Sequence, residues 1–149
     1  MLYDKVFTRT SKEKLTFNNP ETMMEFIRSH YFSVEKEQFI LICFETEYFV
    51  KSIRLIATGS IKEVLGHPRN ILQQALRDNA QTIVIAHNHP SKKLYWSIQD
   101  VKVAKVLADI CKILEITLLD AIIFNDVKYI SLLDRITQIF PWEWDKNYK

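Results

Sequence analysis

The sequence contains few of the residues that interrupt or cross-link a chain. Its 149 residues include two glycines, four prolines and two cysteines. So little glycine and proline excludes a flexible linker between two domains, and the length suits a single domain of ordinary size. Cys43 and Cys111 lie in apolar runs and form no Cys-x-x-Cys pair. They therefore argue against a disulfide framework and predict buried free thiols in a reducing cytoplasm.

The sequence also lacks a strong excess of charge and a long hydrophobic run. The net charge of +2 argues against a dedicated duplex-DNA binder, whose affinity rests on neutralising phosphates, although it leaves nucleic acid open as a partner. No apolar run approaches the roughly 20 residues of a membrane span, and the first residues lack the apolar centre of a signal peptide. With 48% hydrophobic and 26% charged residues, the composition is typical of a globular protein. We expect a soluble, cytoplasmic protein without a membrane partner.

Hydrophobic periodicity predicts alternating helices and strands around one core. Apolar residues recur in two stripes on the longest predicted helix, which indicates that most of its surface is buried. The element order predicts a single-domain α/β (α+β) fold with a largely antiparallel or mixed β-sheet and helices packed on it. Helices are expected at about 20–31, 69–78 and 97–115, and strands at 2–8, 39–44, 49–58, 82–86, 117–124 and 127–131. We divide the chain into an N-terminal lead-in and helix (1–32), a main domain (33–132) and a C-terminal tail (133–149).

One constellation of residues suggests chemistry. His87-x-His89 follows a predicted strand, and after seven further residues Ser97-x-x-Asp100 opens the long helix. Two histidines at i and i+2 on an extended segment point the same way, and a residue in the first turn of the next helix can fold back over them. Two nitrogens and one carboxylate oxygen suit Zn²⁺ and leave a fourth position for water, as in catalytic zinc sites. The sequence therefore predicts a metal site at His87, His89 and Asp100.

Simpler interpretations exist for each half of this constellation. A His-x-His pair occurs by chance in many sequences, and Ser97-x-x-Asp100 is close to a capping box, which is commoner than a zinc site. Each half alone favours its simpler interpretation. Together, at this spacing across a strand end and a helix start, they favour the metal site.

These residues resemble the JAMM motif of the JAB/MPN metalloprotease family, H-x-H-x(7)-S-x-x-D, residue for residue. The run from His87 to Ser91 resembles the RadC-like bacterial branch of that family. The resemblance covers about residues 33–132. Further matching pieces are Glu37-Gln38-Phe39, Gly59-Ser60, His67-Pro68-Arg69, Leu119-Asp120 and Ile122-Ile123.

The resemblance implies a cytidine-deaminase-like sandwich and zinc-dependent metallopeptidase or isopeptidase chemistry on a peptide or protein substrate. It implies that Glu37 is the general base and that Ser97 stabilises the oxyanion, with His87, His89 and Asp100 as zinc ligands. Glu35, two residues earlier on an extended segment, competes with Glu37 for the first role. Ser97 has an alternative role as nothing more than the N-cap of the helix.

The sequence departs from the RadC-like pattern at four positions. Lys92 and Trp96 stand where the branch has glycine and proline, and Asn70 and Ala121 stand where it has glutamate and histidine. None of the four is a predicted metal ligand. The departures therefore bear on substrate specificity and on the shape of the active-site loop.

Two other functions stay open at this point. The historical association of RadC-like proteins with DNA repair, together with Lys92-Lys93 and Tyr95-Trp96, suggests a nucleic-acid-binding module. The departures suggest a metal-binding interaction domain without turnover. Phe140, Trp142 and Trp144 in the tail leave self-association open.

Overall fold

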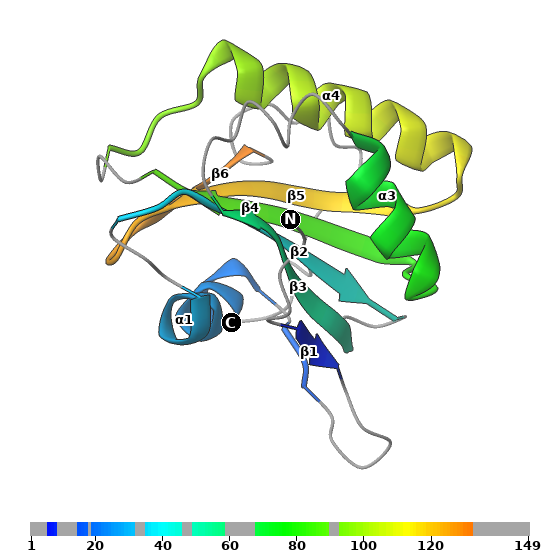
Figure 1. Cartoon of the computed structure of the whole chain (residues 1–149), viewed down its shortest axis with the longest axis horizontal. Coiled ribbons are helices and arrows are strands. Elements are labelled where there is room, and N and C mark those ends of the chain that lie inside the picture. Colours follow the sequence, from blue (N-terminus) through cyan, green and yellow to red (C-terminus); the bar gives the residue numbers. More distant parts are fainter. Residues whose placement is uncertain are drawn as a thin grey trace.

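The computed structural model places a six-stranded mixed sheet between helices on its two faces (Figure 1). This arrangement confirms the predicted α/β class and the mixed sheet with helices packed on it. The structure describes residues 6–8, 15–17, 19–31, 35–45, 49–58, 68–89 and 93–132. Its elements are β1 (Val6–Thr8), α1 (Pro20–Tyr31), β2 (Gln38–Phe44), β3 (Val50–Thr58), α3 (Pro68–Arg77), β4 (Thr82–Asn88), α4 (Ile98–Ile113), β5 (Thr117–Phe124) and β6 (Tyr129–Ser131).

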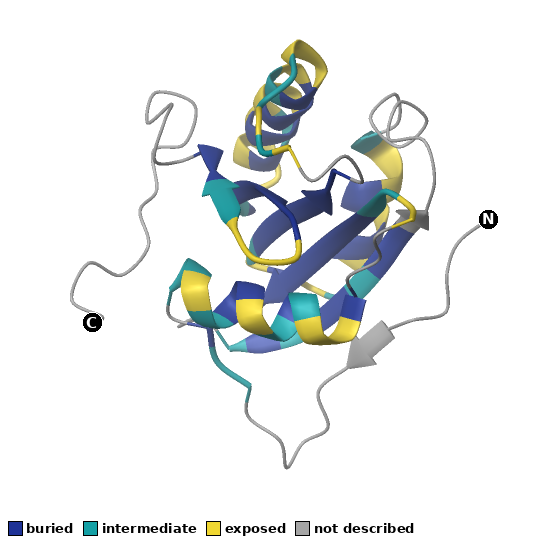
Figure 2. Cartoon of the chain, turned by 90° about the vertical axis from the view of Figure 1, so that its left-hand side faces the viewer, coloured by how far each residue is buried: buried dark blue, intermediate teal, exposed yellow. Residues whose placement is uncertain are grey.

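The sheet has the strand order β1-β3-β2-β4-β5-β6, and β2 and β4 are its central strands. Neighbouring strands are antiparallel except β4 and β5, which run parallel and are connected through α4. Helices α3 and α4 cover one face and α1 covers the other, so the central strands are buried on both sides (Figures 1 and 2). Burial on both faces explains why β2 and β4 are nearly continuous apolar runs and do not alternate.

Helices α3 and α4 each end in a tight turn at a residue with positive φ, a position that glycine usually occupies. After α3, the Ala80 N–H donates to the carbonyl of Ala75 (3.0 Å), and Asn79 takes the left-handed conformation at φ 51°. Glu115 repeats this after α4 at φ 59°. These bonds satisfy carbonyls that the helix leaves unpaired. The turns lead directly into β4 and β5, which pair from their first residues.

Three details of the predicted elements were wrong. Strand β6 begins two residues later than predicted. Strand β4 does not end at Ala86 but continues through His87 and Asn88. Helix α4 is also less buried than its two apolar stripes indicated, because it contacts the sheet along one face. Val106 is 46% exposed and Ile113 is 80% exposed. In the described part of the chain, no helix is both long and apolar enough to cross a membrane.

Cys43 and Cys111 are buried free thiols, as predicted. Burial raises the pKa of Cys43 to about 12 and that of Cys111 to about 11. Both thiols therefore stay protonated at neutral pH, whereas a thiol must ionise to act as a nucleophile or a metal ligand.

Candidate metal centre

The two histidines of the His-x-His motif meet at the end of β4. His87 is the sixth residue of that strand, and His89 directly follows it. Their Nε2 atoms lie 3.0 Å apart, and the two residues are only 5% and 7% exposed. The alternation of side chains along extended backbone brings them to the same side, as the spacing predicted.

Asp100 completes the cluster from the first turn of α4. Its Oδ1 lies 3.2 Å from Nε2 of His87, and its Oδ2 lies 3.8 Å from Nε2 of His89. The three candidate ligand atoms all lie within 4.8 Å of one another. Helix α4 therefore brings a carboxylate onto the end of β4.

These three residues could hold a metal ion. Ligands placed about 2.0–2.1 Å from a tetrahedral ion lie about 3.3 Å from one another. The distance between the two Nε2 atoms (3.0 Å) and the distance from Nε2 of His87 to Oδ1 of Asp100 (3.2 Å) are close to that value. The Nδ1 atom of His89 lies 3.2 Å from the carbonyl oxygen of Lys93. A carbonyl can only accept, so Nδ1 carries the hydrogen and the lone pair of the neutral ring is on Nε2, which faces the cluster.

The electrostatics of the cluster also suit metal binding. Burial lowers the pKa of His89, and the neighbouring His87 lowers it further. Burial opposes ionisation of Asp100, but its hydrogen bonds with His87 and Ser97 outweigh this effect and lower the pKa of its carboxyl group. A neutral imidazole and an ionised carboxylate are the forms that bind metals, so both groups are ready at neutral pH.

Ser97 is the N-cap of α4 and forms a capping box with Asp100. The Asp100 N–H donates to Oγ of Ser97 (3.1 Å), and the Ser97 N–H donates to Oδ2 of Asp100 (2.9 Å). The capping interpretation and the metal-site interpretation therefore describe the same residues, because the box orients the carboxylate that joins the histidines. In the capping bond, Oγ of Ser97 accepts the hydrogen of the Asp100 N–H through a lone pair. The hydroxyl hydrogen of Ser97 takes no part in this bond and can be donated to another group. An oxyanion role for Ser97 stays a prediction.

Glu37 directly precedes β2, the antiparallel neighbour of β4. Phe39 pairs with His87 across these strands, and their rings are nearly parallel with centroids 6.1 Å apart. Glu37 is half-buried, and its charge acts to raise the pKa of His89, whereas Glu35 is exposed. These observations support Glu37 over Glu35 as the group that serves the metal site.

The four departures from the RadC-like pattern fall in different places. Ala121 is buried in β5, two residues before the partner of His87. Trp96 is half-buried beside Ser97, and Asn70 is exposed on α3, in the lining of a hollow between α3 and α4. Lys92 lies outside the described residues, as do Gly59-Ser60, His67 and the aromatic residues of the tail.

Sequence reasoning missed two residues that contact the site. Lys93 orients His89 through its carbonyl oxygen, which no side-chain pattern could indicate. Asn88 turns its side chain toward the segment that carries Glu37. The only available signal for Asn88 was its place between the two histidines.

The comparison with known proteins agrees with this geometry. The family model described as the RadC-like JAB domain matches residues 17–137. The chain belongs to the RadC-like JAB family. The match covers most of the chain and includes His87, His89, Asp100 and Glu37.

Curated relatives of this RadC-like JAB chain are UPF0758 proteins. One from Desulfitobacterium hafniense (strain DSM 10664 / DCB-2) is 34% identical over 118 residues, which are 79% of this chain and 52% of the relative. One from Halalkalibacterium halodurans is 28% identical over 131 residues, which are 88% of this chain and 56% of the relative. The chain thus spans about half the length of these relatives, and their names specify no activity.

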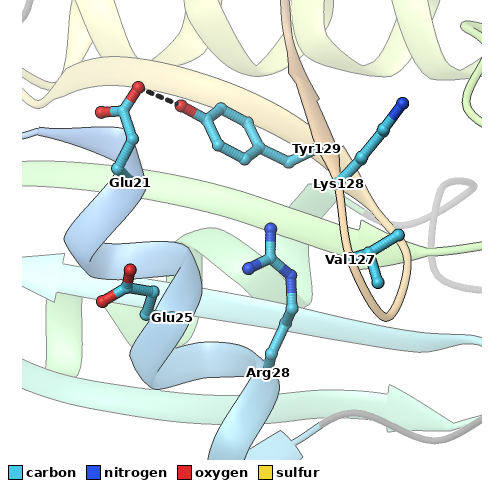
Figure 3. A pocket seen from close by; sticks show the side chains of 6 residues that line it. All are labelled: Glu21, Glu25, Arg28, Val127, Lys128 and Tyr129. Carbon is cyan, nitrogen blue, oxygen red and sulfur yellow. Dashed lines mark hydrogen bonds between the residues drawn. The ribbon is translucent and has the colours of Figure 1, made fainter.

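A second hollow of this RadC-like JAB chain, about 350 Å³ in volume, lies between α1 and the turn from β5 to β6 (Figure 3). Its lining mixes charges of both signs and contains no residue of the metal cluster. The Tyr129 hydroxyl donates to Glu21 (2.7 Å), and Nε of Arg28 donates to the carbonyl of Asn125 (3.2 Å). These bonds attach α1 to the β5–β6 hairpin, which is a structural role.

Proposed function

We propose that this chain is a zinc-dependent hydrolase of the JAMM type that cleaves a peptide or isopeptide bond. The observation that carries the proposal is the buried cluster of His87, His89 and Asp100. The membership of the RadC-like JAB family and the position of Glu37 before β2 support it. Zinc is the metal we favour, because two imidazole nitrogens and one carboxylate oxygen form a borderline donor set.

Each residue of the site has a defined task in this proposal. His87, His89 and Asp100 would hold the ion, which would supply a Lewis acid and lower the pKa of water to about 7. The Glu37 carboxylate takes a proton from the attacking water and delivers it to the leaving amine nitrogen. The Ser97 hydroxyl donates to the carbonyl oxygen as negative charge develops there. Lys93 and Tyr95 are exposed beside His89 and would contact the substrate.

Elemental analysis combined with a peptidase screen tests the proposal. We expect one zinc ion per chain, lost when both His87 and His89 are replaced by alanine. Hydrolysis of a peptide or ubiquitin-like isopeptide substrate should stop with a chelator and return with added zinc. A protein that takes up no metal from excess zinc would contradict the metal site. A zinc-loaded protein that cleaves nothing would favour an interaction domain without turnover.

A Ser97→Ala variant separates the two roles of this serine. Loss of the cap should lower the free energy of unfolding by about 1 kcal/mol, which leaves the protein folded at room temperature. Loss of the hydroxyl donor should lower kcat by about 10²–10³-fold. Urea unfolding and steady-state kinetics measure the two effects, and Ser97→Thr, which keeps the hydroxyl, is the matched control. A Ser97→Ala protein with unchanged kcat would reduce Ser97 to a helix cap.

A further inference from the structure

The side chain of Asn88 bridges the backbone on both sides of Glu37. Asn88 is the last residue of β4 and is completely buried. Its Oδ1 accepts from the N–H of Gln38 (2.5 Å), and its Nδ2 donates to the carbonyl of Lys36 (2.9 Å). Glu37 is the residue between these two, so one amide group holds the short segment on which Glu37 sits.

The chemistry of this bridge requires an amide. Lys36 presents a carbonyl acceptor and Gln38 presents an N–H donor, so the group between them must both donate and accept. Asparagine provides both in one planar group, whereas aspartate only accepts when ionised and alanine does neither. Strand alternation also directs residue 88 away from the side that His87 and His89 share, so the bridge does not compete for the metal.

We propose that Asn88 is a positioning residue that fixes Glu37 relative to the ion held by His87 and His89. Because His87, Asn88 and His89 are consecutive, one short segment at the end of β4 carries two of the three candidate ligands and the clamp on the base. The catalytic part of this inference rests on the proposed function. A displacement of about 1 Å in such a group can cost on the order of 100-fold in rate, so the clamp would matter for turnover.

An Asn88→Ala variant tests this role in the zinc-loaded protein. We expect one zinc ion per chain, a kcat lowered about 10–100-fold and a KM changed by less than about threefold. The control is Asn19→Ala, which removes the N-cap of α1. The Oδ1 atom of Asn19 accepts from the Thr22 N–H (2.9 Å). Loss of this cap should lower the free energy of unfolding by about 1 kcal/mol and leave kcat unchanged.

A second measurement does not depend on turnover. In the protein loaded with Co²⁺, the NMR signal of the Glu37 carboxyl carbon should show a paramagnetic shift, which Asn88→Ala reduces. Exchange of the Gln38 amide hydrogen should also accelerate in the variant, with or without metal. A variant whose kcat and paramagnetic shift equal those of the wild type would overturn the positioning role, even if Gln38 exchanges faster.

These readouts separate failure of this inference from failure of the proposed function. A wild type that binds metal and shows the Glu37 shift, but cleaves nothing, would refute the hydrolase alone. Retention of the positioning role would then depend on whether Asn88→Ala reduces the shift. A wild type that binds neither zinc nor cobalt would overturn both.

Discussion

Replacing Glu37 with glutamine is expected to lower kcat by about 10²–10⁴-fold and to leave the zinc content at one ion per chain. Glutamine keeps the size of the side chain but cannot take up the proton that general base catalysis requires. Glu37 is half-buried and directly precedes β2, so the free energy of unfolding should change little. Steady-state kinetics on the zinc-loaded variant, with metal analysis of the same sample, provide the measurement.

Glu35→Gln is the matched control for this variant. Both changes remove one carboxylate from the same short segment, but Glu35 is exposed. Burial is the main cause of the pKa shift of His89, and of the two glutamates only Glu37 acts on that pKa. We expect Glu35→Gln to retain wild-type kcat. Full activity in Glu37→Gln together with a large loss in Glu35→Gln would assign the base to Glu35. Full activity in both would refute a glutamate base in this segment.

Replacing Asp100 with alanine is expected to have two separable effects. It removes the only carboxylate among the three candidate ligands. Loss of a residue that only orients a ligand typically lowers metal affinity about 10–100-fold, and we expect the zinc affinity of this variant to fall further. The replacement also leaves the Ser97 N–H without its capping acceptor, which should cost the metal-free protein about 1 kcal/mol of stability. Competition with a chromophoric chelator measures the affinity, and urea unfolding measures the stability.

Asp100→Asn distinguishes the ligand from the cap. The asparagine oxygen can still accept from the Ser97 N–H, so this variant should unfold like the wild type when both are free of metal. It lacks the negative charge of the carboxylate, so its zinc affinity should fall nearly as far as that of the alanine variant. Wild-type affinity in Asp100→Asn would limit Asp100 to a structural role at the start of α4.

The features that the sequence predicted correctly depend on short-range geometry. Side-chain alternation along extended backbone places His87 and His89 together whatever the rest of the fold does. Ser97 and Asp100 are three residues apart, so they meet as soon as α4 begins. Hydrophobic periodicity likewise predicted the helices and most strand bounds, because one face of each element must be buried. The three candidate metal ligands could therefore be named from their spacing.

What only the tertiary structure decided concerns residues far apart in the chain. Asn88 and Gln38 are separated by 50 positions and meet because β2 and β4 are neighbours in the sheet, which no local pattern specifies. The exposed side of α4 likewise followed from how the helix packs, since apolar spacing does not say which stripe faces a partner. Local hydrogen bonds and periodicity act over a few residues, whereas strand order arises from the burial of the whole core. The sequence by itself therefore determined the candidate ligands of the site, and the fold determined that Asn88 contacts the segment on which Glu37 sits.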